Sequence, residues 1–179
     1  SIDGETFHSD RLHKSFPGGS RFLAHDDQDK PVEILICTSD APIDLRLEQQ
    51  ANTPESYASL RLRGSVGERS VAVFDLGTGT TLIGKLAQAR TNRAINDCAE
   101  LTHRIGLPLA KFMVKLQSHG CTLGCHDPAE FWFRDSGEIV LLDVALQSAS
   151  TSELESIELM PAFSPPEAYG RCGGVLNNR

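Results

Sequence analysis

The feature that most constrains the fold is a pair of short apolar runs separated by a tight turn. Residues 131–133 and 139–142 are apolar, and Asp135-Ser136-Gly137 lies between them. Asp tolerates the bent backbone of such a turn, and Gly adopts positive φ without steric cost. The pattern therefore predicts a β-hairpin whose second strand ends at Asp143.

Three carboxylates are predicted at the same end of this hairpin. Asp127 and Glu130 precede its first strand, and Asp143 follows its second. Carboxylate oxygens are the ligands that Mg²⁺ prefers when it accompanies a phosphate chain. This end of the hairpin is therefore a candidate site for a magnesium ion and a phosphorylated ligand.

Two segments resemble signatures of the protein kinase superfamily. Residues 137–145 are similar to the strand and Asp-Phe-Gly turn of that family, with Val144-Ala145 in place of Phe-Gly. Residues 164–170, Ser-Pro-Pro-Glu-Ala-Tyr-Gly, are similar to the Ala-Pro-Glu motif that closes a kinase activation segment. The resemblance implies an α+β, compact two-lobed minimal kinase fold. It also implies ATP and Mg²⁺ as cofactors and transfer of the γ-phosphoryl group to a protein Ser or Thr, with Asp143 holding the metal.

The first half of the chain is predicted to be the β-rich lobe. Residues 1–15 are polar and predict partly irregular structure, whereas residues 21–24 and 32–37 predict two strands. The resemblance makes Gly18, Gly19 and Ser20 the loop that covers the phosphates, although these residues alone favour a plain hairpin turn. The lysine that the family carries on its third strand is absent. Lys14 and Arg21 flank the glycines and are the cations expected near the phosphates.

A helix is predicted over residues 44–50 or from the start signal Thr53-Pro54-Glu55, and two strands over 60–63 and 70–74 follow. In the kinase interpretation Glu48 pairs with the phosphate-binding cation; an exposed helical carboxylate is the alternative. Residues 75–82 resemble the hinge between kinase lobes. The expected division is a lobe of residues 1–77 and a truncated, mainly helical lobe of residues 78–179, with its main helix over 91–117.

The catalytic loop can be aligned with the family in two ways. Without a shift, the family's catalytic Asp falls on Cys125, which cannot act as a carboxylate base, and its Asn falls on Glu130. With a shift of two residues, Asp127 accepts the proton of the substrate hydroxyl and Glu130 becomes a second Mg²⁺ ligand. We favour the shifted alignment; the alternative is that Asp127 only caps a turn.

Only 12 residues follow Glu167, and this truncation resembles the minimal kinases that bacteria inject into host cells, HopBF-like first and OspG-like second. That resemblance implies type III secretion into the host cytoplasm, a role in virulence and a protein substrate, which for HopBF-like kinases is the Hsp90 chaperone. The competing hypothesis is a pseudokinase that works as a binding module, which the missing third-strand lysine and Cys125 favour. A kinase acting on a small molecule is more remote, because such enzymes usually lack a Pro-Pro-Glu segment.

Composition limits the remaining classes of function. A chain of 179 residues is expected to form one domain, and a net charge of −7 argues against non-specific binding of nucleic acid. No apolar run approaches 18 residues, so no membrane partner is expected. The five cysteines are odd in number, typical of reduced thiols in a cytoplasm, and a fourth ligand for structural zinc is missing. A monomer is expected.

Overall fold

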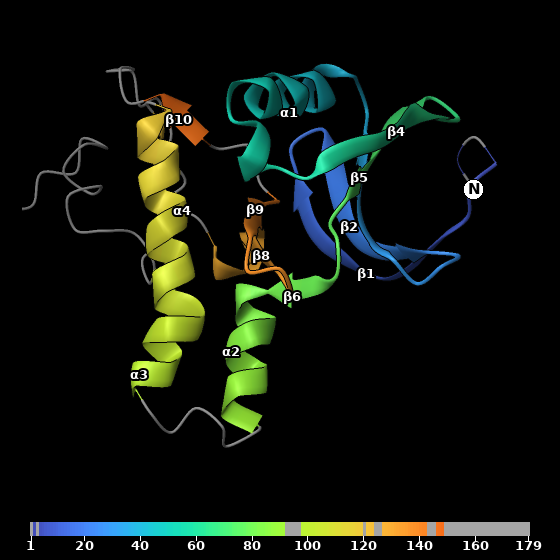
Figure 1. Ribbon diagram of the computed structural model, residues 1–179. Coiled ribbons are helices and arrows are strands. Elements are labelled where there is room, and N and C mark those ends of the chain that lie inside the picture. Colours follow the sequence, from blue (N-terminus) through green and yellow to red (C-terminus); the bar gives the residue numbers. More distant parts are fainter. Residues whose placement is uncertain are drawn as a thin grey trace, which may run out of the picture.

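A five-stranded antiparallel sheet forms the first half of the described part of the chain (Figure 1). The computed structural model describes residues 2, 4–91, 98–119, 121–123, 127–142 and 146–148, and every structural statement here concerns those residues. The strand order is β1-β2-β3-β5-β4, and one helix, α1, and a 3₁₀ turn, η1, connect β3 to β4. The bounds are β1 Phe7–Phe16, β2 Gly19–Asp26, β3 Pro31–Cys37, α1 Ala41–Asn52, η1 Pro54–Ser56, β4 Ser59–Val66 and β5 Arg69–Asp75.

The second half contains the predicted hairpin and most of the described helices. A three-stranded antiparallel sheet has the order β6-β8-β9, and α4 is continuous with α3 through a π-helical turn, η2. The bounds are β6 Gly79–Thr81, α2 Leu82–Thr91, α3 Cys98–Leu101, η2 Thr102–Gly106, α4 Leu107–Ser118, β7 Cys121–Leu123, η3 Pro128–Glu130, β8 Phe131–Arg134, β9 Ile139–Leu141 and β10 Leu146–Ser148. The expected α+β fold is confirmed. None of the helices in these described ranges is long and apolar enough to span a membrane.

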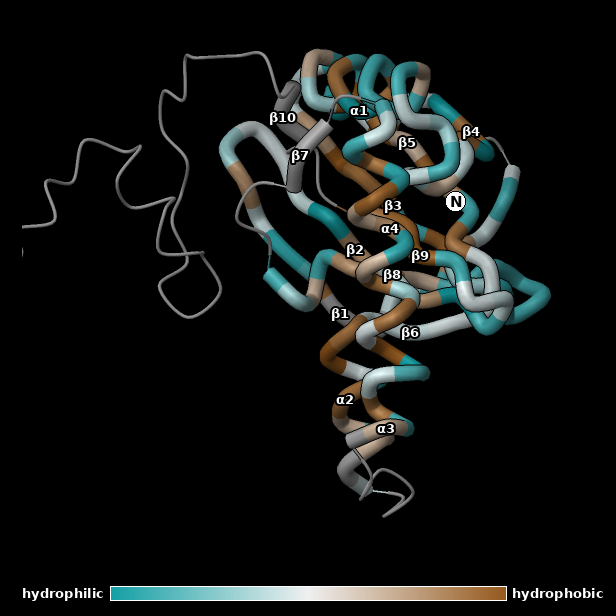
Figure 2. The backbone as a smooth tube through the Cα atoms, turned by 60° about the vertical axis from the view of Figure 1, so that its left-hand side comes forward, coloured by the Kyte–Doolittle hydropathy of each residue, from teal (hydrophilic) through white to brown (hydrophobic). Residues whose placement is uncertain are grey.

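The β8–β9 hairpin contributes to the packing of both halves. In register, Phe131 pairs with Leu141 and Phe133 with Ile139, around a turn in which Gly137 has a φ of 90°. These four apolar residues belong to a cluster with Phe112 and Leu116 of α4. The intervening residues, Trp132 and Val140, belong instead to a cluster with Leu35, Ile43 and Phe74 of the first half. Because side chains alternate along a strand, one short hairpin lines two cores. Figure 1 shows β8 and β9 between α4 and the first sheet, and in Figure 2 they lie near the middle of the tube.

The partly irregular structure predicted over residues 1–15 includes a strand that was not predicted from the sequence. β1 begins at Phe7 and pairs with β2 from Phe7–Asp26 to Phe16–Gly19, with two register irregularities. β1 lies at the edge of the sheet, so its polar side chains remain largely accessible while its backbone bonds to β2. A polar sequence is compatible with an edge strand, and pairing with the neighbouring strand decides the conformation.

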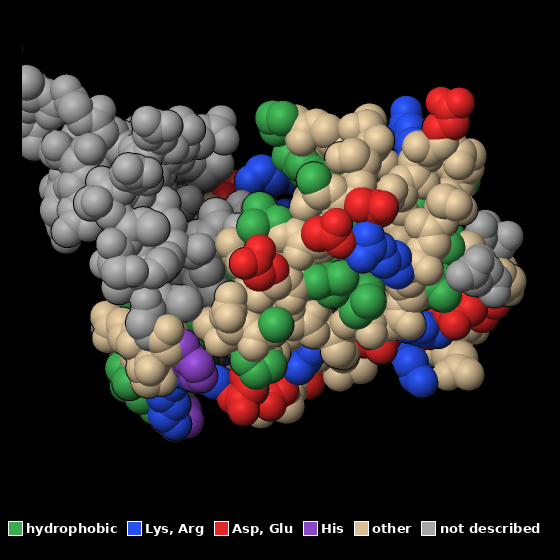
Figure 3. Space-filling view, turned by 90° about the horizontal axis from the view of Figure 1, so that it is seen from above, with side chains coloured by type: hydrophobic (Ala, Val, Ile, Leu, Met, Phe, Trp, Pro, Cys, Tyr) green, Lys and Arg blue, Asp and Glu red, His purple; other side chains and the backbone are tan. Residues whose placement is uncertain are grey.

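Charged side chains fix α1 and the first turns of the sheet. Arg63 of β4 binds both Asp40 and Asp44 at the start of α1, at 3.1 and 2.8 Å. Carboxylates in this position also interact favourably with the partial positive charge of a helix N-terminus. In the view from above (Figure 3), acidic and basic side chains are interspersed, and no single large charged patch is visible on that face.

Asp26 organises the turn between β2 and β3. Its Oδ1 accepts hydrogen bonds from the backbone N–H groups of Gln28 and Lys30, both at 2.9 Å, and its Oδ2 accepts one from Arg61 Nη1 at 2.7 Å. The Arg61 hydrogen bond and the two turn amides lower the pKa of the Asp26 carboxyl to about 2, against 3.8 for an unperturbed Asp. The ionised form is therefore stabilised by folding.

The substitution Asp26→Asn tests this contribution. Asn keeps an oxygen for the turn amides but loses the charge that Arg61 binds. A depressed folded-state pKa gives stability that is present above pH 3.8 and is lost as the pH falls through about 2. The difference in unfolding free energy between wild type and variant, measured by urea titration, should therefore be largest at pH 5–6 and shrink toward pH 2. A difference that is independent of pH would contradict the role of the charge.

Candidate functional site

A pocket of about 410 Å³ lies where the first sheet meets the connection to the second half. This volume is within the range of roughly 300–1,000 Å³ that is usual for small-molecule sites. Its lining is mostly apolar, with the hydroxyls of two threonines and one imidazole, and consists of Leu23, Ala24, His25, Pro31, Leu76, Thr80, Thr81 and Trp132. The pocket therefore has the size and composition to accept a flat ring.

The connection beside this pocket is held by side chains of β8. Residues 76–78 link β5 to β6, in the stretch that the sequence predicts as a hinge. Arg134 Nε donates to the Leu76 carbonyl at 2.7 Å, and Trp132 Nε1 donates to the Gly77 carbonyl at 3.2 Å. Gly77 has a φ of 72°, which favours glycine at this bend. The hinge backbone is thus fixed to the hairpin by donors from the protein itself.

A chain of alternating charges crosses the sheet beside this pocket. Lys14 Nζ lies 3.0 Å from Glu130 Oε1, and Glu130 Oε2 lies 2.5 Å from Arg21 Nη1. Arg21 Nε lies 2.8 Å from Glu33 Oε1, and Glu33 Oε2 lies 3.0 Å from Arg46 Nη2. Every side chain except that of Lys14 is at most 1% exposed. We call these five residues the ion-pair chain.

Strand register explains how the ion-pair chain forms. Lys14 is directly opposite Arg21 across β1 and β2, and Arg21 is opposite Leu35 across β2 and β3. Glu33 is two residues from Leu35, so it lies on the same face of β3 and diagonally next to Arg21. Arg46 reaches Glu33 from α1, and its guanidinium also stacks 4.2 Å from the centre of the Tyr57 ring. Such stacking favours a buried cation.

The ion-pair chain reverses the charges expected between the third strand and the following helix. Kinases place a lysine on this strand and a glutamate on the helix; here the carboxylate, Glu33, is on β3 and the cation, Arg46, is on α1. Of the two alternatives for Glu48, the structure shows the exposed helical carboxylate. Ile43 and Arg46 face the sheet, and Glu48, two residues further along a helix of 3.6 residues per turn, is exposed.

The predicted phosphate loop is a tight turn between β1 and β2. Gly18 has a φ of 82°, and its carbonyl accepts hydrogen bonds from the backbone and hydroxyl of Thr38, at 2.8 and 3.2 Å. A side chain on Gly19 would lie 2.7 Å from the Phe16 ring, so close packing requires glycine there. Ser20 is the next residue of β2. The hairpin interpretation is confirmed, and contact of this turn with a phosphate stays a prediction.

The acidic end of the hairpin is only partly described. Asp127 caps η3 by accepting from the Ala129 amide at 2.8 Å, and Glu130 has both carboxylate oxygens on cations of the ion-pair chain. Asp143, Cys125 and the Ser-Pro-Pro-Glu motif lie outside the described residues.

The described residues do not fit a Mg²⁺ site. No group of three His, Cys, Asp or Glu side chains that could hold a metal ion occurs among them. To bind Mg²⁺, Glu130 would have to leave Lys14 and Arg21, and the buried Arg21 guanidinium would lose the carboxylate at its Nη1. The sequence hinted at this arrangement, since the charged residues Arg21 and Glu33 stand within otherwise apolar strand patterns and require partners when buried.

Two substitutions that should lower the free energy of unfolding by different amounts test the ion-pair chain. Glu33→Gln removes the carboxylate 3.0 Å from the buried Arg46 Nη2 and should lower the free energy of unfolding by about 3–5 kcal/mol. Arg46→Met leaves Glu33 bound to Arg21 and should cost less, about 1–3 kcal/mol. The double variant should be more stable than Glu33→Gln alone, because the cation that lost this carboxylate is also removed. Urea unfolding at pH 7 provides these values, and a double variant as unstable as the sum of the two singles would contradict the coupling.

Comparison with known proteins supports the fold. No protein-family model matches the chain, and no curated protein matches its sequence. Among solved structures, the chain is similar to one described as the crystal structure of the BubR1 kinase domain, with a TM-score of 0.57 and 17% sequence identity. The match covers 80% of this chain and 48% of that one, so the chain spans about half the length of that kinase domain. The protein has a protein-kinase-like fold.

Proposed function

We propose that this domain is a pseudokinase: a kinase-like fold that works as a binding module and does not transfer phosphate. The observation that carries the proposal is the ion-pair chain. Lys14 and Arg21, the cations expected to contact phosphates, are both bound to Glu130. Both carboxylate oxygens of Glu130, the expected second Mg²⁺ ligand, are engaged by cations.

Burial makes this arrangement difficult to exchange for a phosphate chain. Arg21 and Glu130 are each 1% exposed. Separating a buried ion pair leaves uncompensated charge in a medium of low dielectric constant and costs about 3–5 kcal/mol. A polyphosphate would have to replace Glu130 on both cations at this cost, and its metal would then need ligands that the described residues do not provide.

The second candidate is the ATP-dependent protein Ser/Thr kinase predicted from the sequence. The pocket beside residues 76–78 favours it, because its volume of about 410 Å³ and its mostly apolar lining suit a nucleoside base. Asp127, Asp143, the Mg²⁺ requirement, secretion into a host and the Hsp90 partner remain predictions that rest on the resemblance. Phosphoryl transfer decides between the two candidates.

The first test is transfer of labelled γ-phosphate from ATP, with Mg²⁺ and with Mn²⁺, to proteins of a eukaryotic lysate and to purified Hsp90. A pseudokinase should give no labelling above that of Asp143→Ala. Labelling that is lost in both Asp143→Ala and Asp127→Ala would refute the proposal and establish the kinase with the shifted catalytic loop. Labelling lost only in Asp143→Ala would establish a kinase whose base is not Asp127.

Nucleotide binding provides a second and independent prediction. Trp132 is the only tryptophan of the chain and lines the pocket, so its fluorescence reports directly on occupancy. In the wild type, ATP should bind no more tightly than adenosine, because its phosphates meet cations that are already paired. Glu130→Gln removes the carboxylate that both cations share and should make ATP bind about tenfold more tightly than adenosine, a difference of about 1.4 kcal/mol.

Glu138→Gln is the matched control, since this glutamate lies in the hairpin turn and is 66% exposed. It should leave the affinities for both ligands unchanged. A wild type that already prefers ATP over adenosine by tenfold or more would contradict the proposal, because the ion-pair chain would then not prevent the phosphates from binding.

A further inference from the structure

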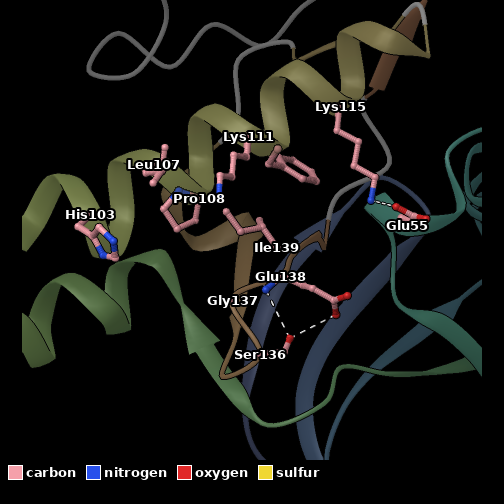
Figure 4. Close-up of a pocket in the computed structure, with 11 residues that line it drawn as sticks. Glu55, His103, Leu107, Pro108, Lys111, Lys115, Ser136, Gly137, Glu138 and Ile139 are labelled. Atoms are coloured by element: carbon pink, nitrogen blue, oxygen red, sulfur yellow. Dashed lines mark hydrogen bonds and ion pairs between the residues drawn. The ribbon is translucent and has the colours of Figure 1, made fainter.

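A second pocket, also of about 410 Å³, lies on the other side of the β8–β9 hairpin (Figure 4). α4 forms one wall and the hairpin turn forms the other. The apolar part of the lining comes from Leu107, Pro108 and Phe112 of α4 and from Ile139 of β9. Ile139 belongs to the cluster on the α4 side of the hairpin, whereas Trp132 belongs to the opposite cluster. This pocket is therefore separate from the one beside the hinge.

The negative charges around this second pocket are compensated. Glu55 of η1 forms an ion pair with Lys115 of α4 at one end, as Figure 4 shows. Glu138 contacts Arg134 Nη1 at 3.2 Å and Ser136 Oγ at 3.3 Å. Each carboxylate that lines the pocket thus has its own cationic partner, Lys115 for Glu55 and Arg134 for Glu138.

One positive charge of the pocket is not compensated. Lys111 extends from α4 toward Pro108 and Ile139 in Figure 4, and it forms no ion pair with any residue in the described ranges. His103 lies eight residues before Lys111, about two helical turns further toward the start of this helical segment. The lining has two carboxylates and two lysines, and within the described ranges Lys111 is the one of these four without an ion-pair partner.

We propose that this pocket binds a small molecule that carries one carboxylate on an apolar ring or acyl body. The carboxylate would pair with the Lys111 ammonium. The apolar body would cover Leu107, Pro108 and Ile139 and remove their surface from water. A volume of about 410 Å³ accommodates a molecule of this size, and an apolar lining with few polar groups is typical of small-molecule sites.

The proposal is tested with two probes of the same shape, 2-naphthoate and its neutral amide, 2-naphthamide. Binding to the whole chain is measured by saturation-transfer NMR titration. The wild type should bind the carboxylate about tenfold more tightly than the amide, as expected for one charge-assisted contact of about 1.4 kcal/mol. Lys111→Gln should abolish this preference, and Lys111→Arg should retain most of it. Lys85→Gln on α2, which removes a lysine outside the pocket, should change nothing.

A second variant tests the apolar wall without disturbing the core. Leu107 is 42% exposed and lies within the continuous helical segment of α3, η2 and α4, where Gln is a good helix former and adds no charge beside Lys111. Leu107→Gln should retain the circular dichroism of the wild type and lose affinity for 2-naphthoate by at least tenfold. The proposal is overturned if the wild type binds neither probe, if it binds both equally, or if Lys111→Gln retains the preference for the carboxylate.

Discussion

The packing of this protein depends on a hairpin that is apolar on both faces. The seven residues of β8 and β9 supply side chains alternately to the core beneath the five-stranded sheet and to the core beside α4. Trp132 and Arg134 of the same hairpin also hold the backbone of residues 76–78. The hairpin is therefore the element that both halves share, and the two pockets lie on its opposite sides because it separates them.

The ion-pair chain determines which charged groups beside the hinge pocket are paired with one another. Buried charges are tolerated only when each has a partner of opposite sign, and here every member has at least one. Lys14, Arg21 and Glu130, which the kinase interpretation of the sequence assigns to phosphates and metal, bind one another instead. A kinase-like fold and a different use of its cleft are compatible, because fold and site are specified by different residues.

Much of the fold was predictable from local patterns, and much of the site was not. Apolar runs around Asp135-Ser136-Gly137 specified the hairpin, and the Gly18-Gly19 pair specified the turn between β1 and β2. Partners of Glu130 and Glu33 depend on strand register and on residues far away in the chain, such as Arg21, which is 109 positions from Glu130. Helix phase, which separates Arg46 from Glu48, could have been read from the position of Ile43. The role of Asp143 lies outside what the structure describes.

Alternating charge makes the members of the ion-pair chain depend on one another during sequence change. Exchanging Glu33 and Arg46 for the lysine and glutamate of a typical kinase would place a cation directly beside Arg21. Arg21 would then have to change, which would leave Glu130 with Lys14 alone. A route between the two arrangements therefore requires several coordinated substitutions, and each single step passes through a protein with an unpaired buried charge. Such a barrier would keep a lineage in the arrangement it already has.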